Sequence, residues 1–225
     1  MEQKQYWNSV SENKQFTTPF QAEEFSKYID PSSSILDVGC GYGRTLRELY
    51  EMGYRNLIGI DFSEGMIARG KSLYPELDLR VKADDTIALQ DHSVDAVILF
   101  AVLTCICENE KQKELIQEIR RVLKPGGILY VNDFLLNNDE RNLSRYQKFQ
   151  DKYGVYGAFE LPEGAVCRHH SEDWIFELLR DFETLRYEPL TFTTMNGHTS
   201  NGFYFIGKTE VEHADQSNSV FQSFA

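Results

Sequence analysis

The sequence predicts an α/β fold in which helices cover both faces of a mostly parallel sheet. Short apolar runs rich in β-branched residues alternate with segments of helical period, a pattern typical of βαβ units. Three glycines at alternate positions follow the first of these runs and precede a helical segment. The length of 225 residues, with 41% hydrophobic and 26% charged residues, indicates one globular domain.

Seven apolar runs are predicted strands. In chain order they are residues 35–38, 56–60, 77–82, 94–100, 127–134, 185–194 and 202–208. The last two runs are joined by residues typical of a hairpin turn, Met195-Asn196-Gly197-His198.

The clearest predicted helix spans residues 109–123, because its apolar residues repeat at the spacing of one buried face and Pro125 and Gly126 then end it. Ser171 is a favourable N-cap for a second helix, since acidic residues follow it near the positive end. A further helical stretch covers residues 139–152, and residues 1–30 predict one or two helices ahead of the sheet.

We expect residues 1–209 to form a single domain, with a helical cap over residues 1–30. Residues 135–170 are expected to be a lid-like insertion, because so long a connector in a compact domain usually carries a function. Residues 210–225 are mostly polar and predict a loosely held tail.

Charge and composition exclude several classes of protein. The 23 basic and 35 acidic residues give a net charge of −12, so repulsion from phosphate disfavours nucleic-acid partners. No apolar run reaches the ~20 residues of a membrane-spanning helix, and no apolar stretch follows the N-terminus, which predicts a cytoplasmic protein without a membrane partner. The four cysteines lack a C-x-x-C pair, and no metal is expected, because Cys167, His169 and His170 lack a distant fourth ligand.

The densest motif is Asp37-Val38-Gly39-Cys40-Gly41-Tyr42-Gly43, at the carboxyl end of the first predicted strand. Glycine lets the backbone turn sharply and lets a ligand lie against main-chain N–H groups, so a nucleotide-like ligand is expected there. The third glycine comes one position too early for the G-x-G-x-x-G fingerprint of dinucleotide-binding proteins. Asp61 ends the second predicted strand about 20 residues further on, where an acid accepts ribose hydroxyls.

In order along the chain, these residues resemble the motifs of the class I S-adenosylmethionine-dependent methyltransferases. Residues 36–43 look like the first motif, 59–63 like the second, Asp84 like the acid of the third, and 123–127 like the turn before the fifth strand. The resemblance covers residues 34–134, under half of the chain. It implies S-adenosylmethionine as cofactor, S-adenosylhomocysteine as product, and a Rossmann-like seven-stranded sheet whose last strand is antiparallel.

The resemblance also implies cofactor-binding residues. Those expected on the methionine part are Asp37, Gly39, Gly41, Tyr42 and Gly43. Asp61 is expected on the ribose. Asp84, Asp85, Phe62 and Met66 are expected on and around the adenine. Phe100 and Ala101 are expected near the transferred methyl group. The segment Phe100-Ala101-Val102-Leu103 departs from the Asn/Asp-Pro-Pro-Tyr tetrapeptide, which argues against amide or adenine nitrogens as acceptors.

We therefore expect methyl transfer to an O, N or S atom of a small molecule. Transfer from a sulfonium needs chiefly positioning, desolvation and sometimes a base. The candidate bases are His169 and His170, for which a structural role is the alternative, and Asp133 is a candidate for orienting the substrate. The aromatic side chains expected to wall the substrate pocket are Tyr6, Trp7, Tyr153 and Tyr156. A nicotinamide-dependent oxidoreductase and a non-catalytic S-adenosylmethionine-binding protein remain the alternative functions.

Overall fold

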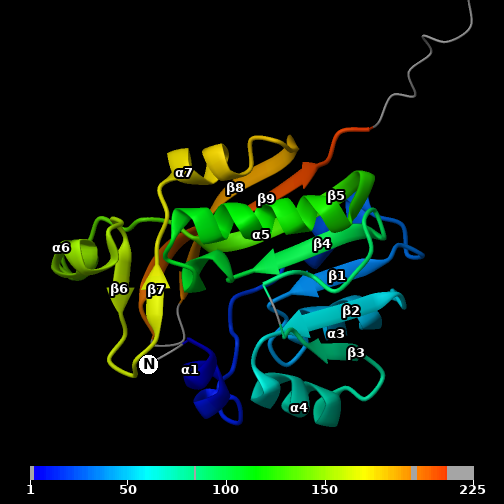
Figure 1. The fold of residues 1–225 in the computed structure, drawn as a ribbon, viewed down its shortest axis with the longest axis horizontal. Helices are drawn as coiled ribbons and strands as arrows, with labels where there is room; N and C mark the ends of the chain where they lie inside the picture. The colour runs from blue at the N-terminus through cyan, green and yellow to red at the C-terminus, as the bar shows by residue number, and fades with distance from the viewer. Residues whose placement is uncertain (1–2, 84, 194–196, 212–225) are drawn as a thin grey trace, which may run out of the picture.

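The computed structural model describes residues 3–83, 85–193 and 197–211. Its centre is a seven-stranded sheet with the strand order β3-β2-β1-β4-β5-β9-β8 (Figure 1). The strands are β1 (Ile35–Val38), β2 (Leu57–Asp61), β3 (Asp78–Val81), β4 (Val94–Phe100), β5 (Leu123–Phe134), β8 (Glu183–Thr193) and β9 (Thr199–Lys208). Neighbouring strands from β3 to β5 pair in parallel, whereas β9 is antiparallel to β5 and to β8. The predicted fold class is confirmed.

Helices cover both faces of this sheet and so make three layers. One face carries α2 (Ala22–Phe25), α3 (Arg44–Glu51) and α4 (Glu64–Leu73), and the other carries α5 (Asn109–Val122) and α7 (Glu172–Leu178). The remaining helical elements are α1 (Gln3–Val10), α6 (Glu140–Tyr153) and the 3₁₀ turns η1 (Ser26–Tyr28) and η2 (Leu103–Cys105). The predicted N-cap of α7 is confirmed, since the Ser171 hydroxyl accepts a hydrogen bond from the Trp174 N–H at 3.2 Å.

The core consists of two apolar layers, because successive side chains of a strand point to opposite faces. In β4, Val97 and Leu99 pack under α5 and α7, whereas Ala96 and Ile98 pack under α2 and α3. The inner strands β1, β2 and β4 are largely buried on both faces, as expected for a parallel sheet covered on both sides, whereas the edge strands β3 and β8 are largely exposed.

The observed elements extend beyond the predicted ones at several places, including the starts of β8 and β9. Strand β5 begins at Leu123, directly after α5, and a register shift against β4 lies between Val94 and Ala96. The 135–170 insertion contains α6 and also an antiparallel pair that the sequence did not reveal, β6 (Ala158–Glu160) with β7 (Val166–Arg168). Residues 194–196 of the predicted hairpin turn and 212–225 of the predicted tail lie outside the described residues.

The parallel strands direct their carboxyl ends toward the side of the molecule where α1 and the β6–β7 pair lie (Figure 1). Ligands of open α/β sheets bind outside these carboxyl ends. Among the described helices, none has the length and apolar character that crossing a membrane requires.

Candidate functional site

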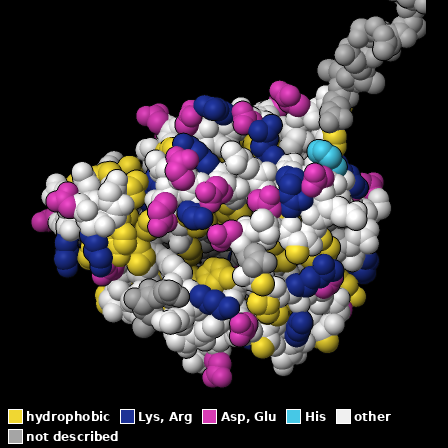
Figure 2. Space-filling model, viewed as in Figure 1, with side chains coloured by type: hydrophobic (Ala, Val, Ile, Leu, Met, Phe, Trp, Pro, Cys, Tyr) yellow, Lys and Arg dark blue, Asp and Glu magenta, His cyan; other side chains and the backbone are white. Residues whose placement is uncertain are grey.

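A cavity of about 620 Å³ lies at the carboxyl ends of the parallel strands. Its walls come from the glycine loop after β1, the ends of β2 and β4, the N-terminal segment, and the insertion. On the face seen in Figure 2 the centre of the molecule is hollowed, and hydrophobic side chains are visible there between flanking charged ones. The cavity therefore brings together two regions that the sequence analysis could only treat separately, the glycine loop and the insertion.

The glycine loop is a tight turn whose N–H groups bond within the protein. The N–H groups of Gly39 and Cys40 both donate to the Ile60 carbonyl, at 2.8 and 3.1 Å, and that of Gly43 donates to the Cys40 carbonyl at 2.9 Å. Gly39 and Gly41 have φ angles of 75° and 55°, a region that favours glycine. These three N–H groups are thus engaged within the protein, and contact between the loop and a ligand stays a prediction. What the loop offers a ligand is close approach at Gly39 and Gly41, which carry no Cβ.

Asp37 places in the site a buried carboxyl group that has no hydrogen-bond partner in the described part of the chain. It lies in β1 with an exposed fraction of 1%, lines the cavity, and neither carboxylate oxygen has a hydrogen-bond partner among the described residues. Burial, followed by the nearby Asp61 charge, raises the pKa of Asp37 to about 8. A buried carboxylate of this kind requires a cationic or hydrogen-bond-donating partner. A cofactor with an ammonium group, such as the S-adenosylmethionine implied by the resemblance, fits this requirement.

Asp61 connects the second strand to the glycine loop. Its two carboxylate oxygens accept hydrogen bonds from the N–H of Gly41 at 2.9 Å and from the N–H of Ser63 at 2.8 Å. Burial raises the pKa of Asp61, and these two bonds act in the opposite direction. Each carboxylate oxygen keeps a second lone pair, so Asp61 can hold the loop and still accept bonds from ribose hydroxyls.

The region expected to hold the adenine follows β2 and β3. Phe62 and Met66 line the cavity, and Met66 is buried at the start of α4. Asp85 also lines the cavity, where Lys111 Nζ lies 3.4 Å from its carboxylate. Asp84, the acid assigned by resemblance, lies outside the described residues.

At the end of β4, Phe100 and Ala101 line the cavity as expected. Ala101 has a φ angle of 55°, which is uncommon for a residue with a Cβ, and its N–H donates to the Asn132 carbonyl at 2.7 Å. Strained backbone of this kind is often found at functional sites. Tyr42 and Gly43 do not contribute to the described lining: Gly43 packs against Leu77 and Leu79 of the β3 region.

The N-terminal segment closes the cavity over the glycine loop. A Cβ on Gly41 would lie 2.6 Å from the Phe16 ring, and that ring stacks on Tyr42 with centroids 5.2 Å apart. The Arg69 guanidinium lies over the Tyr42 ring, 4.1 Å from the ring centroid. It donates hydrogen bonds to the carbonyls of Ser11 and Lys14. Tyr6 and Trp7 of α1 line the cavity, as the sequence analysis expected.

On the insertion side, His169 lines the cavity with its ring between two aromatic side chains. Phe134 stacks on it at 5.5 Å and Phe159 meets it edge-on at 4.9 Å. The Nδ1 atom lies 2.6 Å from the Tyr146 hydroxyl and 3.1 Å from the Asn137 amide nitrogen. Burial, with a further contribution from the Arg145 charge, lowers the pKa of His169 well below 6.5, so the ring is neutral at pH 7.

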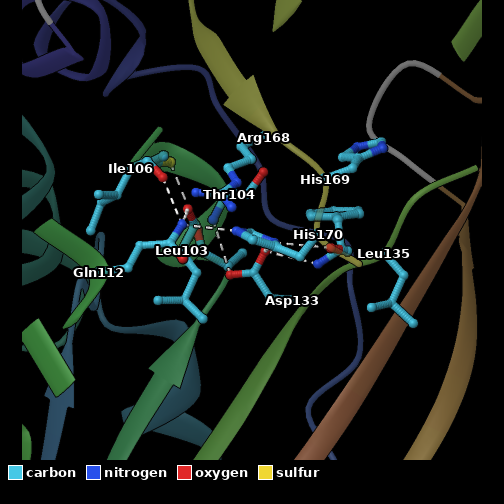
Figure 3. A network of polar contacts seen from close by, with 12 residues as sticks. Leu103, Thr104, Ile106, Gln112, Asp133, Leu135, Arg168, His169 and His170 are labelled. Atoms are coloured by element: carbon cyan, nitrogen blue, oxygen red, sulfur yellow. Dashed lines mark hydrogen bonds and ion pairs between the residues drawn. The ribbon is translucent and has the colours of Figure 1, made fainter. Parts of the chain in front are cut away.

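His170 belongs to a separate polar network (Figure 3). Its Nδ1 lies 3.1 Å from the Phe134 carbonyl and its Nε2 lies 2.9 Å from the Gln112 amide nitrogen, which places the ring proton on Nδ1. Both ring nitrogens are therefore engaged. Burial lowers the pKa of His170 to about 3, and the residue does not line the described cavity.

Asp133 lies in the same network. One carboxylate oxygen accepts from the Thr104 N–H at 3.2 Å, the other from the Phe134 N–H at 2.8 Å, and His170 Nδ1 is 4.0 Å away. Burial raises the pKa of Asp133 to about 7. This side chain is fully enclosed and supports the η2 turn, so its placement favours a positioning role over contact with a substrate.

Of the four aromatic residues expected to wall the substrate pocket, two line the described cavity and two do not. Tyr153 donates to Glu160 at 2.7 Å and Tyr156 is 42% exposed, and the described cavity lining includes neither. Several lining residues were not among the predicted site residues; they are Phe16, Arg44, Val102, Cys105, Phe134, Arg145 and Phe159. Over the described residues no three His, Cys, Asp or Glu side chains are arranged to hold a metal ion.

Comparisons with known proteins agree with this geometry. A family model for a methyltransferase domain matches residues 36–131. The carboxy-S-adenosyl-L-methionine synthase of Campylobacter fetus subsp. fetus is 31% identical over 145 residues, which cover 61% of this chain and 61% of that protein. The human eEF1A lysine and N-terminal methyltransferase is 33% identical over 112 residues, which cover 45% of this chain and 16% of that protein. The chain thus spans less than two thirds of the length of these curated relatives.

The fold likeness is broader than the sequence likeness. The crystal structure of a SAM-dependent methyltransferase from Methanosarcina mazei superimposes with a TM-score of 0.81 at 25% identity, over 87% of this chain and 100% of that one. The family model spans β1 to β5, the part that carries Asp37, the glycine loop and Asp61. These matches support the resemblance of this chain to S-adenosylmethionine-dependent methyltransferases.

Proposed function

We propose that this protein transfers a methyl group from S-adenosylmethionine to an O, N or S atom of a small molecule. When bound, the cofactor supplies an electrophilic methyl group on a sulfonium. The observation that carries the proposal is one continuous cavity that reaches from Asp37 and Asp61 to His169. The first two residues suit the charged and hydroxylated parts of the cofactor, and the insertion side leaves a second region for an acceptor.

The acceptor region suits a reaction that depends on positioning and exclusion of water. Its aromatic side chains, Phe134 and Phe159, hold His169 between them, and α1 with Trp7 covers the cavity from the other side. A water-poor site favours displacement at a sulfonium, because the charged centre is neutralised as the methyl leaves. The reaction then needs only a base that accepts the proton of the acceptor atom.

In our proposal His169 is the base that accepts this proton. The amide nitrogen of Asn137 has two further acceptors, the Leu135 carbonyl at 3.0 Å and the Ser200 hydroxyl at 3.1 Å, so both of its hydrogens have other partners. The Nδ1–H of His169 is then able to donate to the Tyr146 hydroxyl. This tautomer leaves the Nε2 lone pair available for an acceptor proton.

A small acceptor is favoured over a protein. The acceptor region lies between α1 and the insertion, in a cavity of about 620 Å³ that the cofactor would also occupy, and this volume suits a small molecule. The human relative named for eEF1A is a methyltransferase of a protein, so a protein acceptor is the alternative. The two alternatives from the sequence analysis, a nicotinamide-dependent oxidoreductase and a non-catalytic S-adenosylmethionine-binding protein, are separated from the proposal by experiment.

Two measurements test the proposal. Calorimetric titration is expected to give binding of S-adenosylhomocysteine and none of NAD, and the reverse result contradicts it. Formation of S-adenosylhomocysteine from S-adenosylmethionine is then followed with a panel of small metabolites and, in parallel, a pool of lysine-containing peptides. Turnover with small molecules supports the proposal, turnover with peptides alone replaces its substrate class, and tight cofactor binding without turnover favours the non-catalytic alternative.

A further inference from the structure

The insertion side of the cavity contains a cation without a protein counter-charge. Arg145 of α6 lines the cavity, and no described carboxylate lies within the 4.0 Å ion-pair distance of its guanidinium. Its Nε atom is buried and has no hydrogen-bond partner among the described residues. The guanidinium lies over the Phe159 ring at 3.4 Å from the centroid, and its polar neighbours are Tyr146, Cys167 and the like-charged Arg141.

Three other cations that line the cavity are paired with carboxylates, and a fourth, Lys14, has its Nζ 3.1 Å from the Tyr6 hydroxyl. Lys111 Nζ lies 2.9 Å from Glu114, Arg44 lies 2.7 Å from Glu48, and Arg141 lies 3.9 Å from Asp139. Acidic residues outnumber basic ones by 35 to 23, so acids are not scarce in this chain. Glu163, which also lines the cavity, stays beyond ion-pair distance of Arg145. A half-buried arginine in these surroundings is balanced most simply by an anion that arrives with a ligand.

We propose that Arg145 determines acceptor specificity by binding a carboxylate carried by the substrate. The inference rests on the function proposed above and adds a substrate class, small carboxylic acids with an apolar or aromatic body. A guanidinium stacked on an aromatic ring keeps its N–H edge available for a carboxylate in a bidentate arrangement. A single carboxylate balances one cation, whereas a phosphate of about two charges needs a second one, and Arg141 already has a partner.

The position of Arg145 also couples the carboxylate to His169. The two residues are close enough for the Arg145 charge to contribute to the lowered pKa of His169. A carboxylate bound to Arg145 offsets that charge, so the pKa of His169 rises when substrate is present, while burial continues to lower it. The acceptor would then increase the basicity of the group that receives its proton.

The test uses the full-length protein saturated with S-adenosylhomocysteine. Its probes are matched pairs of small carboxylic acids and their primary amides, beginning with benzoate and benzamide and extending to hydroxylated and aliphatic pairs. Binding is measured by calorimetry for the wild type, Arg145→Met and Arg145→Lys. Arg180→Met is the control, because Arg180 is 66% exposed and pairs with Glu177 away from the cavity.

In the wild type and in Arg180→Met, we expect at least one acid to bind about tenfold or more tightly than its amide. That preference is expected to fall below about twofold in Arg145→Met and to be partly retained in Arg145→Lys, because lysine keeps the charge and loses the fork. The inference is overturned if no pair shows an acid preference, if no probe binds, or if Arg145→Met keeps the preference. It is also overturned if Arg145→Met weakens S-adenosylhomocysteine itself, since the carboxylate is then the cofactor's. Failure of the wild type to bind S-adenosylhomocysteine refutes the proposed function instead.

Discussion

Replacing Asp37 by Asn tests how the buried carboxyl group of β1 takes part in cofactor binding. The two side chains have nearly the same shape, so the change removes the charge and little else. With a pKa of about 8, Asp37 is about nine-tenths protonated at pH 7 in the cofactor-free protein. If Asp37 faces the cofactor's ammonium group, the carboxyl must lose this proton when the ligand binds.

The magnitude follows from the pKa. Binding of S-adenosylhomocysteine is expected to release about 0.9 proton at pH 7 and about 0.5 proton at pH 8. Affinity should therefore rise about ninefold from pH 6 to pH 7 and about fivefold from pH 7 to pH 8, because ionised Asp37 is the form that binds. In Asp37→Asn we expect no proton release, no such pH dependence, and an affinity at pH 8 lower by tenfold or more.

The assay is calorimetry in buffers of equal pH and different ionisation enthalpy, since the observed heat changes in proportion to the protons exchanged. Thermal or denaturant unfolding of the cofactor-free proteins is a second readout. The folded-state pKa lies above the ordinary value of 3.8, so the stability that the protonated group contributes is present below pH 3.8 and is lost as the pH rises to about 8. Asp37→Asn should retain that stability, roughly 5 kcal/mol at pH 8. A wild-type protein that binds without releasing a proton at pH 7 refutes this reasoning.

Four further substitutions probe the cavity and the polar network beside it. Asp61→Ala should weaken S-adenosylhomocysteine at least tenfold in titrations, because charge-assisted hydrogen bonds are lost, and an effect below twofold contradicts the ribose role. Gly41→Ala should also lower that affinity while the circular dichroism stays native, because its Cβ would meet Phe16 at 2.6 Å; Gly154→Ala, with a similar φ of 66° and open space around it, should not. With an accepted substrate, His169→Ala should lower kcat by ~100-fold and leave the cofactor affinity unchanged. His170→Ala should instead lower the free energy of unfolding by about 1–3 kcal/mol, since Gln112 and the Phe134 carbonyl lose a buried partner.

The sheet was predictable because its determinants are local. The inner strands β1, β2 and β4 are apolar runs of the right length, and the helix around Ile116 and Ile119 shows its buried face through spacing alone. The β6–β7 pair was missed for the converse reason. Strands of three residues, Ala158–Glu160 and Val166–Arg168, are too short to show alternation, and their pairing depends on tertiary contacts.

The cofactor half of the cavity was likewise readable, because its residues follow strand ends at fixed spacing. Asp37 and Asp61 each occupy the end of a parallel strand, so topology alone brings them to one edge of the sheet. Arg145 shows why the acceptor half was not readable. It sits among polar residues of an exposed helix, and only the packing of α6 against β6 turns it toward the cavity.

The two adjacent histidines illustrate the limit of sequence reasoning most directly. His169 and His170 follow β7 in extended backbone, where consecutive side chains point to opposite sides. One of them must then face the cavity and the other the sheet, although sequence gives no register for so short a segment. The register is set by the bridge between Leu135 and His170, which directs His170 toward Gln112 and leaves His169 beside Phe159. A one-residue slip would exchange the two roles, so the contacts of Leu135 decide which imidazole is available to a substrate.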